Sequence, residues 1–132
     1  MLKRLLSLFL GFIAAMAVVL LTQYYTRGMH PPPDDLIFND MEARESYLLG
    51  LPMKVRYYFF ASHLVGAFLG SYIAARLADK HKYYMGLIVG LIFLISTISH
   101  NFGMMSPGWL IVIDFVACVF MILLASRVSS RI

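Results

Sequence analysis

The chain has 132 residues, of which 61% are hydrophobic and only 14% are charged. Soluble domains contain roughly 45 to 50% apolar and about 25% charged residues, so this composition excludes a soluble domain and predicts a single membrane domain over residues 1–132. The net charge of +4 forms no continuous basic face, which argues against a nucleic-acid partner. The single cysteine, Cys118, excludes an intramolecular disulfide and a metal site built from thiolates.

Four apolar stretches are long enough to cross a bilayer as helices, for which about twenty residues suffice. The first follows Lys3 and Arg4, and its apolar residues continue past a candidate signal-peptide cleavage site at 15–17, so we expect it to be retained as a span. The predicted fold is therefore all-α, a polytopic bundle of four transmembrane helices. The predicted spans are residues 5–25, 55–78, 84–99 and 109–126.

The segment 27–54 is the only extended polar stretch, and its run of three prolines favours a stiff polyproline II conformation. Asn39, followed three residues later by Glu42, fits a capping box at the start of a short helix over 40–49. A glycine and then a proline follow this helix and are expected to end it. We expect the helix to lie in the extracytoplasmic interface, across the mouth of the bundle.

Small residues recur every four positions in the second span and therefore form a smooth stripe along one helix face. In membranes such stripes allow a neighbouring backbone to approach closely. The third span carries a shorter pair with the same spacing. The second span is thus expected to be the centre of the bundle. The predicted packing residues are Gly66, Gly70, Ala74, Ala78, Gly86 and Gly90.

The distribution of basic residues predicts the orientation of the chain. Seven of the eleven lysines and arginines lie on the side that holds both termini, and four lie on the other side. The positive-inside rule then predicts cytoplasmic N- and C-termini for a multi-pass membrane protein. The seven are Lys3, Arg4, Arg76, Lys80, Lys82, Arg127 and Arg131.

Polar residues within the spans are the candidate functional groups, because a charge at the bilayer centre costs about 2.5 to 3.5 kcal/mol on insertion scales. Helical spacing places several of them at similar depth, on the side of the segment 27–54. The candidate cluster consists of Asp114, His63, His100 and Asn101, with Arg56 above it. His30 is a further residue that could fold over this cluster.

Four interpretations of the cluster remain open at this stage. It could exchange protons, since histidine titrates near neutral pH. It could bind a metal through two imidazoles and a carboxylate. It could hold a haem between His63 and His100. The fourth interpretation assigns no chemistry, only hydrogen bonds between helices that stabilise the bundle by around 0.6 kcal/mol each. No catalytic residues and no cofactor are predicted.

The chain also shows two resemblances to known proteins. The stretch 66–95 is similar to the loop signature of major facilitator transporters, in which small residues precede Arg-Leu-Ala-Asp-Lys at 76–80. The glycine expected among the following basic residues is replaced in Lys80-His81-Lys82, and four spans are far fewer than the twelve of such transporters. The order of features along nearly the whole chain resembles a group of small bacterial four-span membrane proteins without a known activity. That resemblance implies only a fold and a location, the bacterial inner membrane.

In that group another histidine often lies beside the proline that precedes the fourth-span tryptophan. This chain has Ser106-Pro107-Gly108 there, which lowers the expectation of a shared metal centre. The sequence therefore favours a structural or accessory component of a membrane assembly, with lipid and either a second copy or a larger complex as partners. The alternative is a small transporter or a proton- or ion-handling protein that uses the Asp/His cluster. A membrane enzyme is the less favoured third interpretation.

Overall fold

The computed structural model describes residues 1–32 and 40–132, and this part of the chain is all-helical. Four of its helices are long and apolar enough to cross a membrane, which confirms the predicted all-α bundle of four spans. The spanning helices are α1 (Leu2–Met29), α3 (Met53–Leu77), α4 (Lys82–Gly103) and α5 (Gly108–Arg131), and α2 (Met41–Leu49) is the short helix between the first two.

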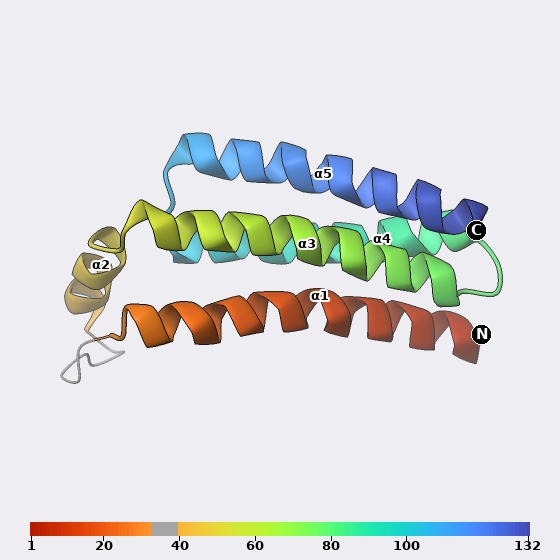
Figure 1. Cartoon of the computed structure of the whole chain (residues 1–132), viewed down its shortest axis with the longest axis horizontal. Coiled ribbons are helices and arrows are strands. Elements are labelled where there is room, and N and C mark those ends of the chain that lie inside the picture. The colour runs from red at the N-terminus through yellow and green to blue at the C-terminus, as the bar shows by residue number, and fades with distance from the viewer. Residues whose placement is uncertain (33–39) are drawn as a thin grey trace.

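The four long helices run side by side along the long axis of the molecule (Figure 1). Both chain termini lie at one end of the bundle, which we call the terminal end. Helix α2 lies across the opposite end, which we call the α2 end (Figure 1). An even number of antiparallel spans brings the two termini together in this way.

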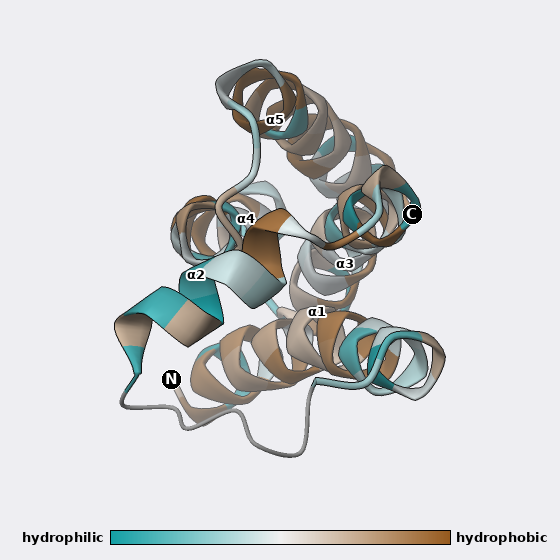
Figure 2. Cartoon of the chain, turned by 90° about the vertical axis from the view of Figure 1, so that its left-hand side faces the viewer, coloured by the Kyte–Doolittle hydropathy of each residue, from teal (hydrophilic) through white to brown (hydrophobic). Residues whose placement is uncertain are grey.

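Helix α2 begins after Asp40, whose side chain accepts a hydrogen bond of 3.1 Å from the backbone N–H of Ala43. This bond satisfies one of the free N–H groups of the first turn. The predicted cap, Asn39, lies outside the described residues. Most of α2 is exposed and hydrophilic, and only Leu48 is buried (Figure 2).

Helices α1, α4 and α5 extend beyond the predicted spans at both ends, whereas α3 is shifted toward the N-terminus, over 53–77 instead of 55–78. Helix α4 continues to Gly103 rather than ending near residue 99, so the connection to α5 is four residues long, shorter than the gap 100–108 between the two predicted spans. Hydropathy marks only the apolar part of a helix, whereas backbone hydrogen bonds continue through polar residues. The carbonyl oxygen of His100, for example, accepts the N–H of Met104 at 2.9 Å. His100 and Asn101 are therefore helical.

Helix α3 is the centre of the bundle. It contacts α1, α4 and α5, whereas α1 and α5 do not contact each other and lie on opposite sides of the α3–α4 pair (Figure 2). Half of the most apolar stretch of α3 is buried, against 22% for α1. This arrangement agrees with the central position predicted for the second span.

The small-residue stripe of α3 packs against α1. A Cβ atom added at Gly70 would lie 2.8 Å from the backbone oxygen of Gly11 and 2.8 Å from the Cβ atom of Ala15. The matching stripe on α1 was not predicted. It consists of Ser7, Gly11, Ala15 and Val19, which are all buried and again spaced by four residues. The two backbones therefore lie in direct contact, as small residues allow in membranes.

The glycine pair of α4 packs inside the bundle as well. A Cβ atom at Gly86 would lie 2.9 Å from the backbone oxygen of Ser71 in α3. A Cβ atom at Gly90 would overlap the side chain of Ile122 in α5. Both predicted stripes are thus occupied by helices of the same chain, which leaves neither of them free for a partner protein.

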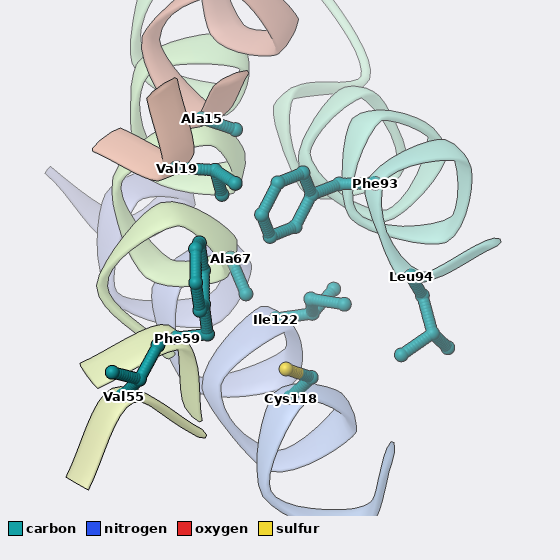
Figure 3. Packing of buried hydrophobic residues seen from close by; sticks show 9 residues of the cluster. All are labelled: Ala15, Val19, Val55, Phe59, Ala67, Phe93, Leu94, Cys118 and Ile122. Atoms are coloured by element: carbon teal, nitrogen blue, oxygen red, sulfur yellow. The ribbon is translucent and has the colours of Figure 1, made fainter. Parts of the chain in front are cut away.

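Large apolar side chains fill the space between the stripes (Figure 3). The Phe93 ring reaches from α4 toward Ala15 and Val19 of α1, and Ile122 and Cys118 approach from α5. Phe93 is 1% exposed, and its ring lies against Gly66, where a Cβ atom would be 2.8 Å away. The core cluster consists of Ala15, Val19, Val55, Phe59, Ala67, Phe93, Leu94, Cys118 and Ile122.

Candidate functional site

One buried carboxylate joins three helices near the α2 end. Asp114 of α5 is 1% exposed, and its Oδ2 lies 2.6 Å from Nδ1 of His63 on α3. The same oxygen accepts a hydrogen bond of 2.5 Å from Nδ2 of Asn101 on α4. Its Oδ1 accepts a weaker bond, 3.3 Å long, from Sγ of Cys118. Three of the five predicted cluster residues, Asp114, His63 and Asn101, therefore meet in one hydrogen-bonded group.

Local sequence explains how these groups come together. Pro107 and Gly108 start α5, and Asp114 follows about two turns later, on the same face as Cys118 four residues on. His63 lies on the face of α3 that also carries Ala67 and Ser71, all buried. The helical extension of α4 brings Asn101 to the same level.

The carboxylate leaves little capacity for a metal cation. It offers about four acceptor sites, and three donors already occupy three of them. A cation would have to displace a hydrogen-bond donor in a dry environment, where each lost bond costs free energy. The hydrogen bonds on Asp114 therefore favour proton chemistry over metal chemistry.

His63 retains one free ring nitrogen. When Nδ1 donates its proton to Asp114, Nε2 becomes the acceptor atom of the ring. The His63 side chain is fully buried, and Nε2 has no hydrogen-bond partner within residues 1–32 and 40–132. In such an Asp–His pair, the free Nε2 can accept a proton, while Nδ1 keeps its hydrogen bond to the carboxylate.

His100 lies next to this pair without bonding to Asp114. Its ring centroid is 5.2 Å from that of His63, with the two planes nearly perpendicular, and 4.7 Å from that of Phe59. Nδ1 of His100 is buried and has no partner in the described part of the chain. The two imidazoles thus place two unpartnered nitrogens in one region of the core.

The geometry does not fit a haem between the two histidines. A haem needs its two axial imidazoles on opposite sides of the macrocycle. His63 and His100 instead touch edge to face, which leaves no gap for a porphyrin ring. No group of three or more His, Cys, Asp or Glu residues that could hold a metal occurs among the described residues. The Asp114 carboxylate bonds directly to Nδ1 of His63. It therefore orients this histidine and is not arranged as a third ligand to an ion shared with the two imidazoles.

Arg56 does not join the cluster. Its Nη1 donates to the backbone oxygen of Met104 at 2.6 Å and to Oγ of Ser106 at 3.3 Å, and its Nη2 donates to the backbone oxygen of Leu48 at 2.8 Å. It therefore ties α2 and the α4–α5 connection to α3. The guanidinium group of Arg56 is buried and therefore needs acceptors, and carbonyls at helix ends lie outside the hydrogen-bond ladder of their own helix.

Sequence reasoning missed two features of the site. The hydrogen bond from Cys118 to Asp114 was not predicted, although the four-residue spacing between them is a signal for a contact. The buried hydroxyls of Ser71 and Ser126, farther toward the terminal end, also have no hydrogen-bond partner in the part that the structure describes. Single serines in an apolar span give no comparable signal.

A cavity of about 280 Å³ opens at the α2 end, between α1, α2, α3 and α4. Buried Phe59 and half-buried His100 line its inner part, and the exposed side chains of Arg27 and Arg44 line its outer part. His30, which was expected to lie above the cluster, lines this cavity, and its backbone oxygen accepts a hydrogen bond from Oη of Tyr47 at 2.9 Å. His100 therefore separates the cavity from the His63–Asp114 pair.

Comparison with known proteins returns no matching family model, no matching curated protein and no matching solved structure. The class of this protein is therefore described from its fold and its site. The chain is an all-helical bundle whose four long helices can span a membrane and which encloses a hydrogen-bonded Asp/His cluster.

Proposed function

We propose that this protein handles protons in the bacterial inner membrane, and that the His63–Asp114 pair takes up and releases a proton through His100 and the cavity at the α2 end. One observation carries the proposal. Asp114, fully buried in a membrane-spanning helix, bonds to one ring nitrogen of His63, while the other ring nitrogen is free and the ring lies against His100. Ionisable groups at such positions mark proton relays in pumps and transporters.

Imidazole chemistry supports a relay between these groups. A proton that arrives at Nε2 of His63 makes the ring cationic, and the ring can then pass its Nδ1 proton to Asp114 over 2.6 Å. His100 lies at the boundary between the cavity and the core, so it is the group placed to exchange protons with water. Asn101 and Cys118 hold the carboxylate in position during this exchange.

The expected orientation assigns the α2 end to the extracytoplasmic side. Seven of the eleven basic residues belong to the terminal end, which supports cytoplasmic termini under the positive-inside rule. Helix α2 would then be the extracytoplasmic interfacial helix, and the cluster would open outward. Labelling of single cysteines at positions 3 and 44, in a Cys118→Ser background, tests this orientation in intact cells. The orientation predicts labelling from outside at position 44 only.

Proton flux into liposomes that contain the purified protein and a trapped pH dye tests the proton-handling function. Under an imposed membrane potential, we expect flux clearly above that of protein-free vesicles, and a loss of at least tenfold in Asp114→Asn. Ser96→Ala is the matched control, because the Ser96 hydroxyl bonds only to a carbonyl of its own helix. Protein-containing vesicles as tight as empty ones, or an unchanged flux in Asp114→Asn, would contradict the proposal.

A second candidate is a structural or accessory component of a membrane assembly, formed with a second copy or another protein. The outward face of α1 supports it, since Leu5, Phe9 and Ile13 are exposed there and α1 contacts neither α2 nor α5. A partner would have to pack on these large side chains, because the glycine stripes are occupied. Extraction in native lipid particles followed by mass measurement tests this candidate. A single copy without companions would argue against it.

A further inference from the structure

Within residues 1–32 and 40–132, the charged side chains that line the cavity at the α2 end are all basic. Arg27 at the end of α1 and Arg44 in α2 place two guanidinium groups on its exposed side, and His30 adds a third basic side chain. Within the described ranges, no aspartate or glutamate lines the cavity, and neither arginine forms an ion pair. Guanidinium groups bind carboxylates and phosphates through charge-assisted hydrogen bonds.

The inner part of the same cavity is apolar. Val55, Phe59 and Leu48 are buried on this side, and the half-buried His100 ring packs on Phe59. A free anion would leave these walls unused, and a purely apolar molecule would leave the arginines unpaired. The lining therefore complements a molecule with an anionic head and an apolar chain.

The position of the cavity matches such a molecule too. It lies at the end of the spanning helices, at the level along α1 and α3 that also carries the tyrosine pairs 24–25 and 57–58. Aromatic residues of this kind concentrate at the membrane–water interface. The head groups of membrane amphiphiles lie at this level. The volume of about 280 Å³ is close to the lower end, roughly 300 Å³, of small-molecule pockets. It can hold a head group and the first part of one chain.

We propose that this cavity binds a single-chain amphiphile with an anionic head, of the fatty-acid type. Arg27 and Arg44 hold the head, and the chain follows Val55 and Phe59 toward His100. The site does not depend on the proton-handling function, although a bound chain would cover the cavity side of His100 and so block exchange at the Asp/His cluster.

Binding of palmitate to the protein in nanodiscs of neutral phosphatidylcholine tests this site. We expect saturable binding of one palmitate per chain, and at least tenfold weaker binding of hexadecanol, which has the same chain without the charge. Inorganic phosphate should bind at least tenfold more weakly than palmitate. The double substitution Arg27→Gln/Arg44→Gln should weaken palmitate binding at least tenfold.

Two further variants serve as controls for charge and for folding. Arg127→Gln/Arg131→Gln removes the same charge at the terminal end and should leave binding unchanged. Leu51→Trp, which narrows the cavity and keeps both arginines, should also weaken binding, while the helical content measured by circular dichroism stays the same. Any of four results would overturn the proposal. Hexadecanol or phosphate could bind as tightly as palmitate, both arginine double substitutions could weaken palmitate binding equally, or palmitate binding could fail to saturate.

Discussion

The two halves of the bundle use different interactions to hold the same helices together. Toward the terminal end, small residues bring backbones into contact, as at Gly11 with Gly70 and at Gly86 with Ser71. Toward the α2 end, hydrogen bonds to Asp114 join α3, α4 and α5. Lipid is as apolar as leucine, so helix association in membranes relies on close packing and on interhelical hydrogen bonds. The terminal half also contains an interhelical hydrogen bond, 2.9 Å from Oγ of Ser129 to the backbone oxygen of Tyr72, whereas the other half gathers its bonds on one buried carboxylate.

The largest effect is expected from breaking the close-packed half. Gly70→Leu would place side-chain atoms within the space of the Gly11 backbone, which cannot move like a flexible side chain. Overpacking of this kind costs typically 1 to 3 kcal/mol, and we expect about 3 kcal/mol here. Reversible unfolding in mixed micelles measures the free-energy change. Gly28→Leu is the control, since a Cβ atom there meets nothing within 4 Å and the variant should stay near wild type.

Removal of the shared carboxylate should destabilise the polar half less. Asp114→Ala leaves the donors on His63, Asn101 and Cys118 without their acceptor. Interhelical hydrogen bonds in membranes average about 0.6 kcal/mol each, so we expect a loss of about 2 kcal/mol in the same unfolding assay. A loss as large as that in Gly70→Leu would mean that the polar half is the main stabilising region, contrary to the comparison.

Loss of the Arg56 clamp should act locally. Arg56→Met keeps the apolar stem but leaves the carbonyls of Met104 and Leu48 without a charged donor. Such bonds contribute about 1.5 kcal/mol or more, so amide hydrogen exchange in α2 should become roughly tenfold faster, with little change in global stability. Lys54→Met, at an exposed position in the same turn, should leave α2 exchange unchanged. Uniformly faster exchange in all helices would contradict a local role.

The smallest effect on stability is expected for the surface ion pair of Arg4 and Asp79 at the terminal end. Partial desolvation raises the pKa of Asp79, but hydrogen bonds from the backbone N–H groups of Lys80 and Asp79, together with Arg4 at 3.6 Å, bring this pKa below its ordinary value. A lowered pKa means that the carboxylate stabilises the folded state above its unfolded pKa, and that this contribution is lost as pH falls through the folded pKa. Stability should therefore decline below about pH 4.

A pH series of unfolding measurements with Asp79→Asn checks this expectation. In the variant, the part of the stability decline that Asp79 causes should be absent. At pH 7 its free energy of unfolding should differ from that of wild type by less than for any of the substitutions above. Glu45→Gln, at an exposed position of α2, is the control for a general charge effect. An identical pH profile in wild type and Asp79→Asn would contradict the assignment.

The spans and their central helix were predictable because they depend on local patterns. Runs of apolar residues identify four helices, and the four-residue spacing of Gly66 and Gly70 identifies the face that packs. The exact helix ends were not predictable, since α4 continues as a helix through His100 and Asn101 after its apolar pattern ends. The partner stripe on α1 has the same spacing at Ser7, Gly11 and Ala15, although only the stripes of the second and third spans were predicted.

The candidate site was predictable in part. Polar residues in a membrane are few, so Asp114, His63 and Asn101 could be grouped by depth alone. Depth does not give the direction of a side chain, so the hydrogen-bond partners of Arg56 could not be predicted from the sequence. Its acceptors are backbone oxygens at helix ends, and such groups exist in every helix and have no sequence signature.

The sequence by itself determined the environment, the number of spans and the faces that pack, because each depends on side chains within a few turns of one helix. Only the tertiary structure decided which groups meet: Nδ1 of His63 with the Asp114 carboxylate, the two imidazoles edge to face, and Arg56 with the carbonyls of Leu48 and Met104. Those contacts depend on the rotation and the relative shift of neighbouring helices. Both are set by the close approach of Gly70 to α1 and of Gly86 and Gly90 to α3 and α5, which no single helix encodes.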